Sequence, residues 1–156
     1  MQQAPEASDL QGWHKQFAAA ANNRAWDLAV LTRTPAQDQE MLDAAHASAW
    51  HWSAVGAVQH RMRATMLLAE VHALLGHGKS ALRLAQEMQS YFLSEKQTPD
   101  WELAFTHAIY AHAAYAAGEH ELHRQAYADA AAAMQVIADD EDRSIVAKTF
   151  DRVPQP

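Results

Sequence analysis

The chain has no cysteine among its 156 residues. Disulfide bridges, thiolate nucleophiles and thiolate metal ligands are therefore excluded, and the chain does not resemble a disulfide-rich secreted domain. Isoleucine, valine and threonine are also scarce, whereas alanine makes up roughly a fifth of the residues. This balance favours helices over sheets, and it predicts an all-α protein.

Clustered basic residues and long apolar runs are also absent. The formal net charge is −7 and the lysines and arginines are scattered, which argues against nucleic acid as a partner. No apolar run approaches the roughly 20 residues that a membrane helix needs. The first ten residues, MQQAPEASDL, have neither the basic region nor the apolar segment of a signal peptide. We therefore expect a cytoplasmic protein with no membrane partner.

The rest of the chain is organised around a helical hairpin between residues 58 and 92. Apolar residues recur at helical spacing on two sides of the segment from Val58 to Leu75, which predicts a helix covered on both sides. Gly76 supplies a helix-ending turn, and a partner helix should start at Lys79 or Ser80 and run to Phe92. Its single inward stripe contains Leu82, Ala85, Met88 and Phe92.

Helix start and stop signals divide the remaining chain. Ser8 or Asp9 can cap a first helix, Thr34-Pro35-Ala36-Gln37 predicts a second start with a capping box, and Thr98-Pro99-Asp100 predicts another. Gly56 and Gly118 end helices. Glu119 should open a sixth helix, with Leu122, Ala126, Ala130, Ala133 and Ile137 facing inward.

The acidic run from Asp139 to Asp142 should open a short last helix, because carboxylates complement the positive end of the helix dipole. We expect a disordered arm over residues 1–7 and a single all-helical domain over residues 8–153. Its fold would be three antiparallel helical hairpins plus a short C-terminal helix, stacked as an α-α superhelix. A closed helical bundle requires the same amphipathic stripes and is the alternative.

Two segments 42 residues apart can be aligned on Gly76 and Gly118: AEVHALLGHGKSALRLAQEM and AHAAYAAGEHELHRQAYADA. Their helix–turn–helix pattern resembles the tetratricopeptide-repeat family over residues 62 to 135, although that family has a 34-residue period. The eight extra residues are expected near the loop at 93–98. The stretch from Asp43 to Trp52 also resembles uncharacterised bacterial proteins of similar length.

The resemblance implies a concave groove lined by the first helix of each hairpin. By that analogy, Arg63, Met66 and Glu70 would face the groove from one hairpin, and Phe105, His112 and Tyr115 from another. Arg63 and Glu70 lie seven residues apart, so they are alternatively a surface ion pair. The tryptophans at positions 26, 50, 52 and 101 are expected in the core or between hairpins.

The chain contains ten histidines, which are a second set of candidate functional residues. His46, Trp50, His51 and His112 could form a cluster between helices. However, the Glu-x-x-His pattern of carboxylate-bridged metal sites is absent, and His120 and His123 are better explained by a solvated helix start. We therefore expect no metal and no cofactor.

No nucleotide-binding loop, serine elbow or catalytic carboxylate pair occurs in the sequence. The leading hypothesis is a non-catalytic module that binds a protein or peptide in a helical groove. The second hypothesis is a small-molecule or metal-binding protein, possibly an enzyme, that uses the histidine and tryptophan cluster. A third is a homodimer formed through an exposed apolar helix face.

Overall fold

A computed structural model describes residues 3–156, which contain seven α-helices and no strand. The prediction of an all-α fold is confirmed. The helices are α1 (Leu10–Ala29), α2 (Pro35–Val55), α3 (Val58–Leu74), α4 (Gly78–Ser94), α5 (Asp100–Ala116), α6 (His120–Val136) and α7 (Asp140–Phe150). None of these helices is long and apolar enough to cross a membrane. Glu6, within the segment expected to be a disordered arm, accepts a hydrogen bond from the Trp13 indole; residues 1 and 2 lie outside the described residues.

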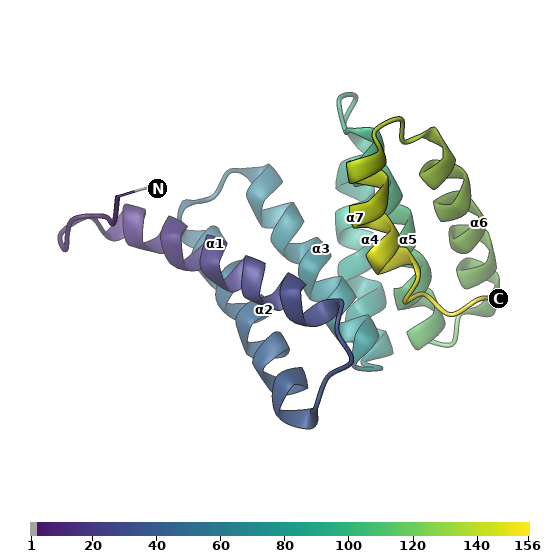
Figure 1. Ribbon diagram of the computed structural model, residues 1–156, viewed down its shortest axis with the longest axis horizontal. Coiled ribbons are helices and arrows are strands. Elements are labelled where there is room, and N and C mark those ends of the chain that lie inside the picture. Colours follow the sequence, from purple (N-terminus) through teal and green to yellow (C-terminus); the bar gives the residue numbers. More distant parts are fainter. Residues whose placement is uncertain (1–2) are drawn as a thin grey trace.

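Consecutive helices pack as three hairpins, α1/α2, α3/α4 and α5/α6, and the hairpins follow one another in an open stack (Figure 1). The first helix of each following hairpin makes the contact with the preceding hairpin. Helix α3 contacts α1 and α2, and α5 contacts α3 and α4. The first and third hairpins make no extensive contact with each other. The short α7 lies on the third hairpin, against α5 and α6. The first helices α1, α3 and α5 therefore form one continuous layer.

The core is centred on α3 and α5, the two helices with neighbours on the most sides. Leu67, Val71 and Ile109 are completely buried there, and alanines at tightly packed positions let the helices approach closely. On α4, Ala85, Met88 and Phe92 are buried as predicted, while Leu82 is only half-buried. The expectation that Leu122 faces inward is wrong: it is exposed, because α6 is an outer helix with a narrow buried stripe.

Three predicted helix starts have the expected capping geometry. The Gln37 amide donates to Thr34 Oγ1 at 3.3 Å and Gln37 Oε1 accepts from the Thr34 amide at 2.9 Å, which completes the capping box. Asp9 accepts from the Gly12 amide at 2.9 Å, and Asp139 accepts from the Asp142 amide at 2.9 Å. The acidic run therefore opens α7, as its sequence predicts.

The Thr98 cap is wrong in detail, although α5 begins where it was predicted. Pro99 takes the N-cap position, and no side chain caps the helix. The Thr98 hydroxyl instead donates to the Phe92 carbonyl at 2.8 Å, at the end of α4. A hydroxyl can satisfy the exposed carbonyls of the preceding helix as readily as the amides of the following one, so this loop is held from its α4 side.

The 42-residue repeat is present in the second and third hairpins. Both have two helices of 17 residues, joined through Gly76 or Gly118 with φ of 75°. In both turns, the residue after the glycine donates its amide to a carbonyl five residues earlier, at 2.8 Å and 2.9 Å, which is the hydrogen bond of a Schellman motif. The two helices of each hairpin occupy 34 residues by themselves, so the extra length lies in the helices rather than in the loop where we expected it.

Candidate functional site

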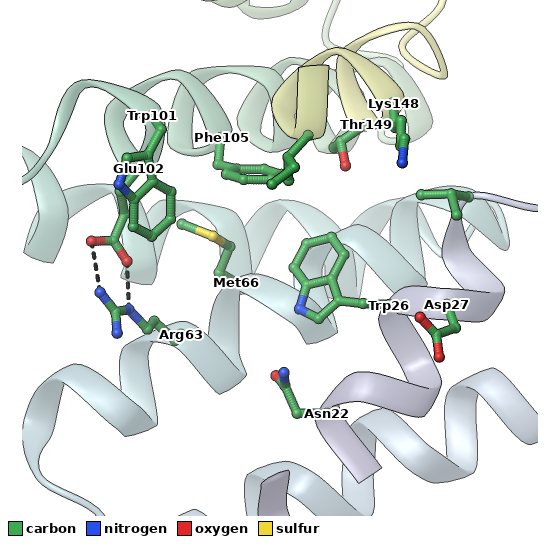
Figure 2. Close-up of a pocket in the computed structure, with 12 residues that line it drawn as sticks. Asn22, Trp26, Asp27, Arg63, Met66, Trp101, Glu102, Phe105, Lys148 and Thr149 are labelled. Carbon is green, nitrogen blue, oxygen red and sulfur yellow. Dashed lines mark hydrogen bonds and ion pairs between the residues drawn. The ribbon is translucent and has the colours of Figure 1, made fainter. Parts of the chain in front are cut away.

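A pocket of about 390 Å³ opens on the layer formed by the first helices of the hairpins. Helices α1, α3 and α5 form its floor and sides, and α7 forms the remaining wall (Figure 2). Its lining residues are Asn22, Trp26, Asp27, Val30, Arg63, Met66, Trp101, Glu102, Phe105, Ile145, Lys148 and Thr149. Elements from every hairpin and from the C-terminal helix thus contribute to one site.

The centre of the pocket is apolar and aromatic. Phe105 packs between two tryptophans, with ring centroids 5.7 Å from Trp26 and 6.2 Å from Trp101. Met66 lies beside them at the middle of α3, and Figure 2 shows the four side chains around the same space. Phe105 and Met66 are anchored in the core, while the two tryptophans are only partly buried. This arrangement suits a ligand with a flat or branched apolar group.

One end of the pocket is held by a two-point ion pair between α3 and α5. Arg63 donates from Nε to Glu102 Oε1 at 2.6 Å and from Nη2 to Glu102 Oε2 at 3.1 Å. The hydrogen bonds to Glu102 raise the pKa of Arg63, and the guanidinium also lies 5.8 Å from the centre of the Trp101 ring. Glu102 is buried, whereas Arg63 reaches solvent. The alternative of an Arg63–Glu70 surface pair is therefore wrong, because the α5 carboxylate takes the guanidinium.

At the rim, the pocket has two opposite charges without ion-pair partners among residues 3–156. Asp27 lies on α1 and Lys148 lies on α7, and both side chains are exposed. Ile145 on α7 also lines the pocket with 48% of its surface exposed, although an isoleucine at a helix surface gains little from water contact. These three residues are available to a ligand without breaking an internal contact.

The six groove residues predicted from the sequence fall into three groups. Arg63, Met66 and Phe105 line the pocket together. Glu70 and His112 face each other inside the protein, with Glu70 Oε2 and His112 Nδ1 4.0 Å apart and with no hydrogen-bond partner for either atom in residues 3–156.

The sixth residue, Tyr115, lies away from the pocket. Half of its side chain is exposed near the end of α5, and its ring packs edge-on against His123 at 5.2 Å. His123 in turn donates from Nε2 to the Pro154 carbonyl at 2.7 Å. Tyr115 and His123 thus help to anchor the C-terminal segment that follows α7.

The residues of the second hypothesis lie in three separate environments. His46 is exposed and its ring packs edge-on against His72. Trp50, which is 64% exposed, and His51 pack with His14 at the open end of the first hairpin, where the two Nδ1 atoms of His14 and His51 are 2.9 Å apart. Burial and the neighbouring His14 lower the pKa of His51. His112 is in the interior, so the four side chains do not line one cavity.

Only three of the twelve lining residues, Arg63, Met66 and Phe105, were predicted from the sequence as groove residues. Trp26 and Asp27 are on α1, and the 42-residue repeat that pointed to α3 and α5 does not extend to the first hairpin. Ile145 and Lys148 are on α7, whose position against α5 has no local signal in the sequence. Glu102 could have been found, because it immediately follows Trp101 and lies one turn before the predicted Phe105–His112 face.

No group of three or more histidine, aspartate or glutamate side chains within residues 3–156 is arranged to hold a metal ion. Comparisons of the chain with protein families, with curated proteins and with solved structures found no match.

Proposed function

We propose that this chain is a helical-hairpin binding protein that holds a peptide segment of a partner protein in the pocket between α1, α3, α5 and α7. The observation that carries the proposal is the aromatic pocket on the layer of first helices. This is the face that tetratricopeptide-like proteins, which the α3–α6 segment resembles, would offer to a peptide. The concave surface of a stack of hairpins is a common site for such partners.

The shape of the pocket favours one apolar anchor side chain on the peptide. Its volume of about 390 Å³ is near the lower end of the range for ligand pockets, roughly 300–1,000 Å³. An aromatic or branched aliphatic side chain would pack against Trp26, Met66 and Phe105. Interfaces are commonly dominated by such buried anchors, while polar groups around the anchor set orientation. Asp27 and Lys148 supply groups of both signs at the rim.

The Arg63–Glu102 pair supports a binding role over a catalytic one. Each charge is satisfied by the other through two hydrogen bonds, and the carboxylate is buried. Because the two side chains hold each other in place, they form a fixed wall of the pocket in which the guanidinium is half-exposed. Neither side chain is free to accept or donate a proton in a reaction. Further guanidinium N–H groups remain for a peptide carbonyl or carboxylate.

The test uses peptides selected by this protein from a random displayed library, with affinities then measured by calorimetry. Ile145→Arg places a charge in the pocket, and Val136→Arg is the matched control, because both side chains are exposed aliphatics but only Ile145 lines the pocket. We expect selected peptides to share an apolar anchor and to lose at least tenfold in affinity with Ile145→Arg but less than twofold with Val136→Arg. Failure to select any peptide, or equal losses for both variants, would contradict the proposal.

A further inference from the structure

Glu70 and His112 occupy the same position in the two copies of the repeat, because each is the thirteenth residue of its 17-residue helix. The two helices pack against each other, and this position brings the carboxyl and the imidazole together in the interior. Both side chains are more than nine-tenths buried, and the two facing atoms are 4.0 Å apart. That distance is too long for a hydrogen bond, but the two atoms are close enough for the charge of one group to affect the other.

The neighbouring charges do not neutralise Glu70 directly. Arg33 and Arg152 are the two cations whose charges act on Glu70, but Arg33 binds Asp38 and the carbonyls at the end of α1, and Arg152 donates to the Val30 carbonyl. His112 is also subject to an electrostatic effect of His123 on α6, whose ring is bound to the Pro154 carbonyl. Among residues 3–156, only His112 places a titratable nitrogen within 4.0 Å of the Glu70 carboxyl.

An ionised carboxylate at this position would be poorly compensated, since burial without a hydrogen-bonded partner strongly disfavours charge. Burial raises the pKa of Glu70 to about 8, and burial lowers the pKa of His112 to about 4. Near neutral pH both groups are thus uncharged, and the pair is not a salt bridge. A protonated carboxyl has one O–H donor, and a neutral imidazole has one unprotonated nitrogen, so the two are chemically complementary.

We propose that Glu70 and His112 form an uncharged, proton-sharing pair that holds α3 against α5, and that loss of the Glu70 proton loosens this contact between the two repeat copies. The Glu70 O–H donates to Nδ1 of His112 after a small side-chain rotation that closes the 4.0 Å gap. His112 is then the tautomer with its proton on Nε2. The contact is stable while Glu70 is protonated and is weakened at alkaline pH. This inference does not depend on what the pocket binds.

The first test is an NMR titration of the full-length, isotope-labelled protein. We expect the Glu70 carboxyl carbon to titrate near its raised value of about 8. The imidazole nitrogens of His112 should show an unprotonated Nδ1 and a protonated Nε2 at pH 7. An ionised Glu70 beside a doubly protonated His112 at pH 6, or a His112 proton on Nδ1, would overturn the proposal.

The second test distinguishes a contact that loosens when Glu70 loses its proton from a contact that is independent of pH. Glu70→Gln keeps an uncharged donor facing His112, and Glu87→Gln is the control on the exposed face of α4. Between pH 7 and pH 9, amide protection around residues 70 and 112 should fall by about tenfold more in the wild type and in Glu87→Gln than in Glu70→Gln. An equal loss of protection in all three proteins would overturn the proposal. If Glu70→Gln does not fold, the NMR titration of the wild type decides the question alone.

Discussion

Arg63 and Phe105 lie 42 residues apart, each as the sixth residue of its helix, and both line the same pocket. The repeat therefore does more than stack two similar hairpins, because equivalent positions of α3 and α5 supply neighbouring parts of one site. Arg63 reaches across to α5 and binds Glu102, which fixes the two helices at this end of the pocket. The pocket is thus a product of hairpin stacking, with α1 and α7 closing its sides.

Loss of the Arg63 side chain should destabilise the protein more than its exposure suggests. Arg63→Ala leaves the Glu102 carboxylate buried without a partner, which typically costs about 3 kcal/mol in the free energy of unfolding. Chemical denaturation of the variant measures this loss. Arg24→Ala is the matched control, since Arg24 also makes two bonds to a carboxylate, Glu40, but both groups are exposed. Because solvent screens that pair, we expect little change there, and equal losses would contradict the explanation.

Gly76 and Gly78 should respond to alanine for different reasons. Gly76 has a φ of 75° and open space where a Cβ would lie, so Gly76→Ala should cost about 1 kcal/mol through backbone conformation alone. Gly78 begins α4 against the end of α5, and its Cβ would lie 2.2 Å from the Ala116 carbonyl oxygen. Gly78→Ala must therefore push two hairpins apart and should cost more. Thermal denaturation of both variants gives the order, and the reverse order would show that this close approach is absent.

The stability of the protein should fall between about pH 6.5 and pH 8. Unfolding lets Glu70 ionise above its ordinary pKa of 4.5, whereas the folded protein holds the proton to about 8, so rising pH opposes folding through this window. His112 acts in the opposite direction: its folded pKa of about 4 lies below the ordinary 6.5, so falling pH opposes folding between these values. The two effects offset each other from about 4.5 to 6.5, and only the Glu70 effect remains above that range.

The expected size of this fall is at most about 1.4 kcal/mol per pH unit, measured by denaturation at a series of pH values. Glu70→Gln should remove the fall between pH 6.5 and pH 8. His107 and His72, whose pKa values burial also lowers, contribute equally to both proteins and cancel in the comparison. Parallel curves for the wild type and Glu70→Gln across this window would contradict the assignment.

Most of the fold could be predicted because its signals are local. The Thr34 capping box, the Gly76 and Gly118 turns and the acidic start of α7 each involve residues within a few positions of one another. Such contacts determine where helices begin and end, and the order of the hairpins follows from short connections. The prediction for Thr98 was wrong because this residue lies between two helix ends, and its hydroxyl binds the carbonyl at the end of α4 rather than an amide at the start of α5.

The site could be predicted only in part because its contacts are distant in sequence. Periodicity places Arg63, Met66 and Phe105 on related helix faces, but it does not show that Arg63 binds Glu102 rather than Glu70. The position of α7 depends on packing against α5, and the contribution of Lys148 follows from that packing. Glu70 and His112 were placed in the groove because the helical pattern does not distinguish a half-exposed face from one covered by a neighbouring helix.

The five tryptophans allow a direct test of where a ligand binds. Trp26 and Trp101 line the pocket, whereas Trp13, Trp50 and Trp52 lie outside it, on α1 and at the C-terminal end of α2. Their indole N–H signals can be followed by two-dimensional NMR while a library-selected peptide is titrated into the full-length protein. We predict that the signals of Trp26 and Trp101 shift with the peptide and that the other three stay in place. Binding that leaves Trp26 and Trp101 unchanged, or that shifts the other three instead, would contradict the proposal that the pocket between α1, α3, α5 and α7 is the binding site.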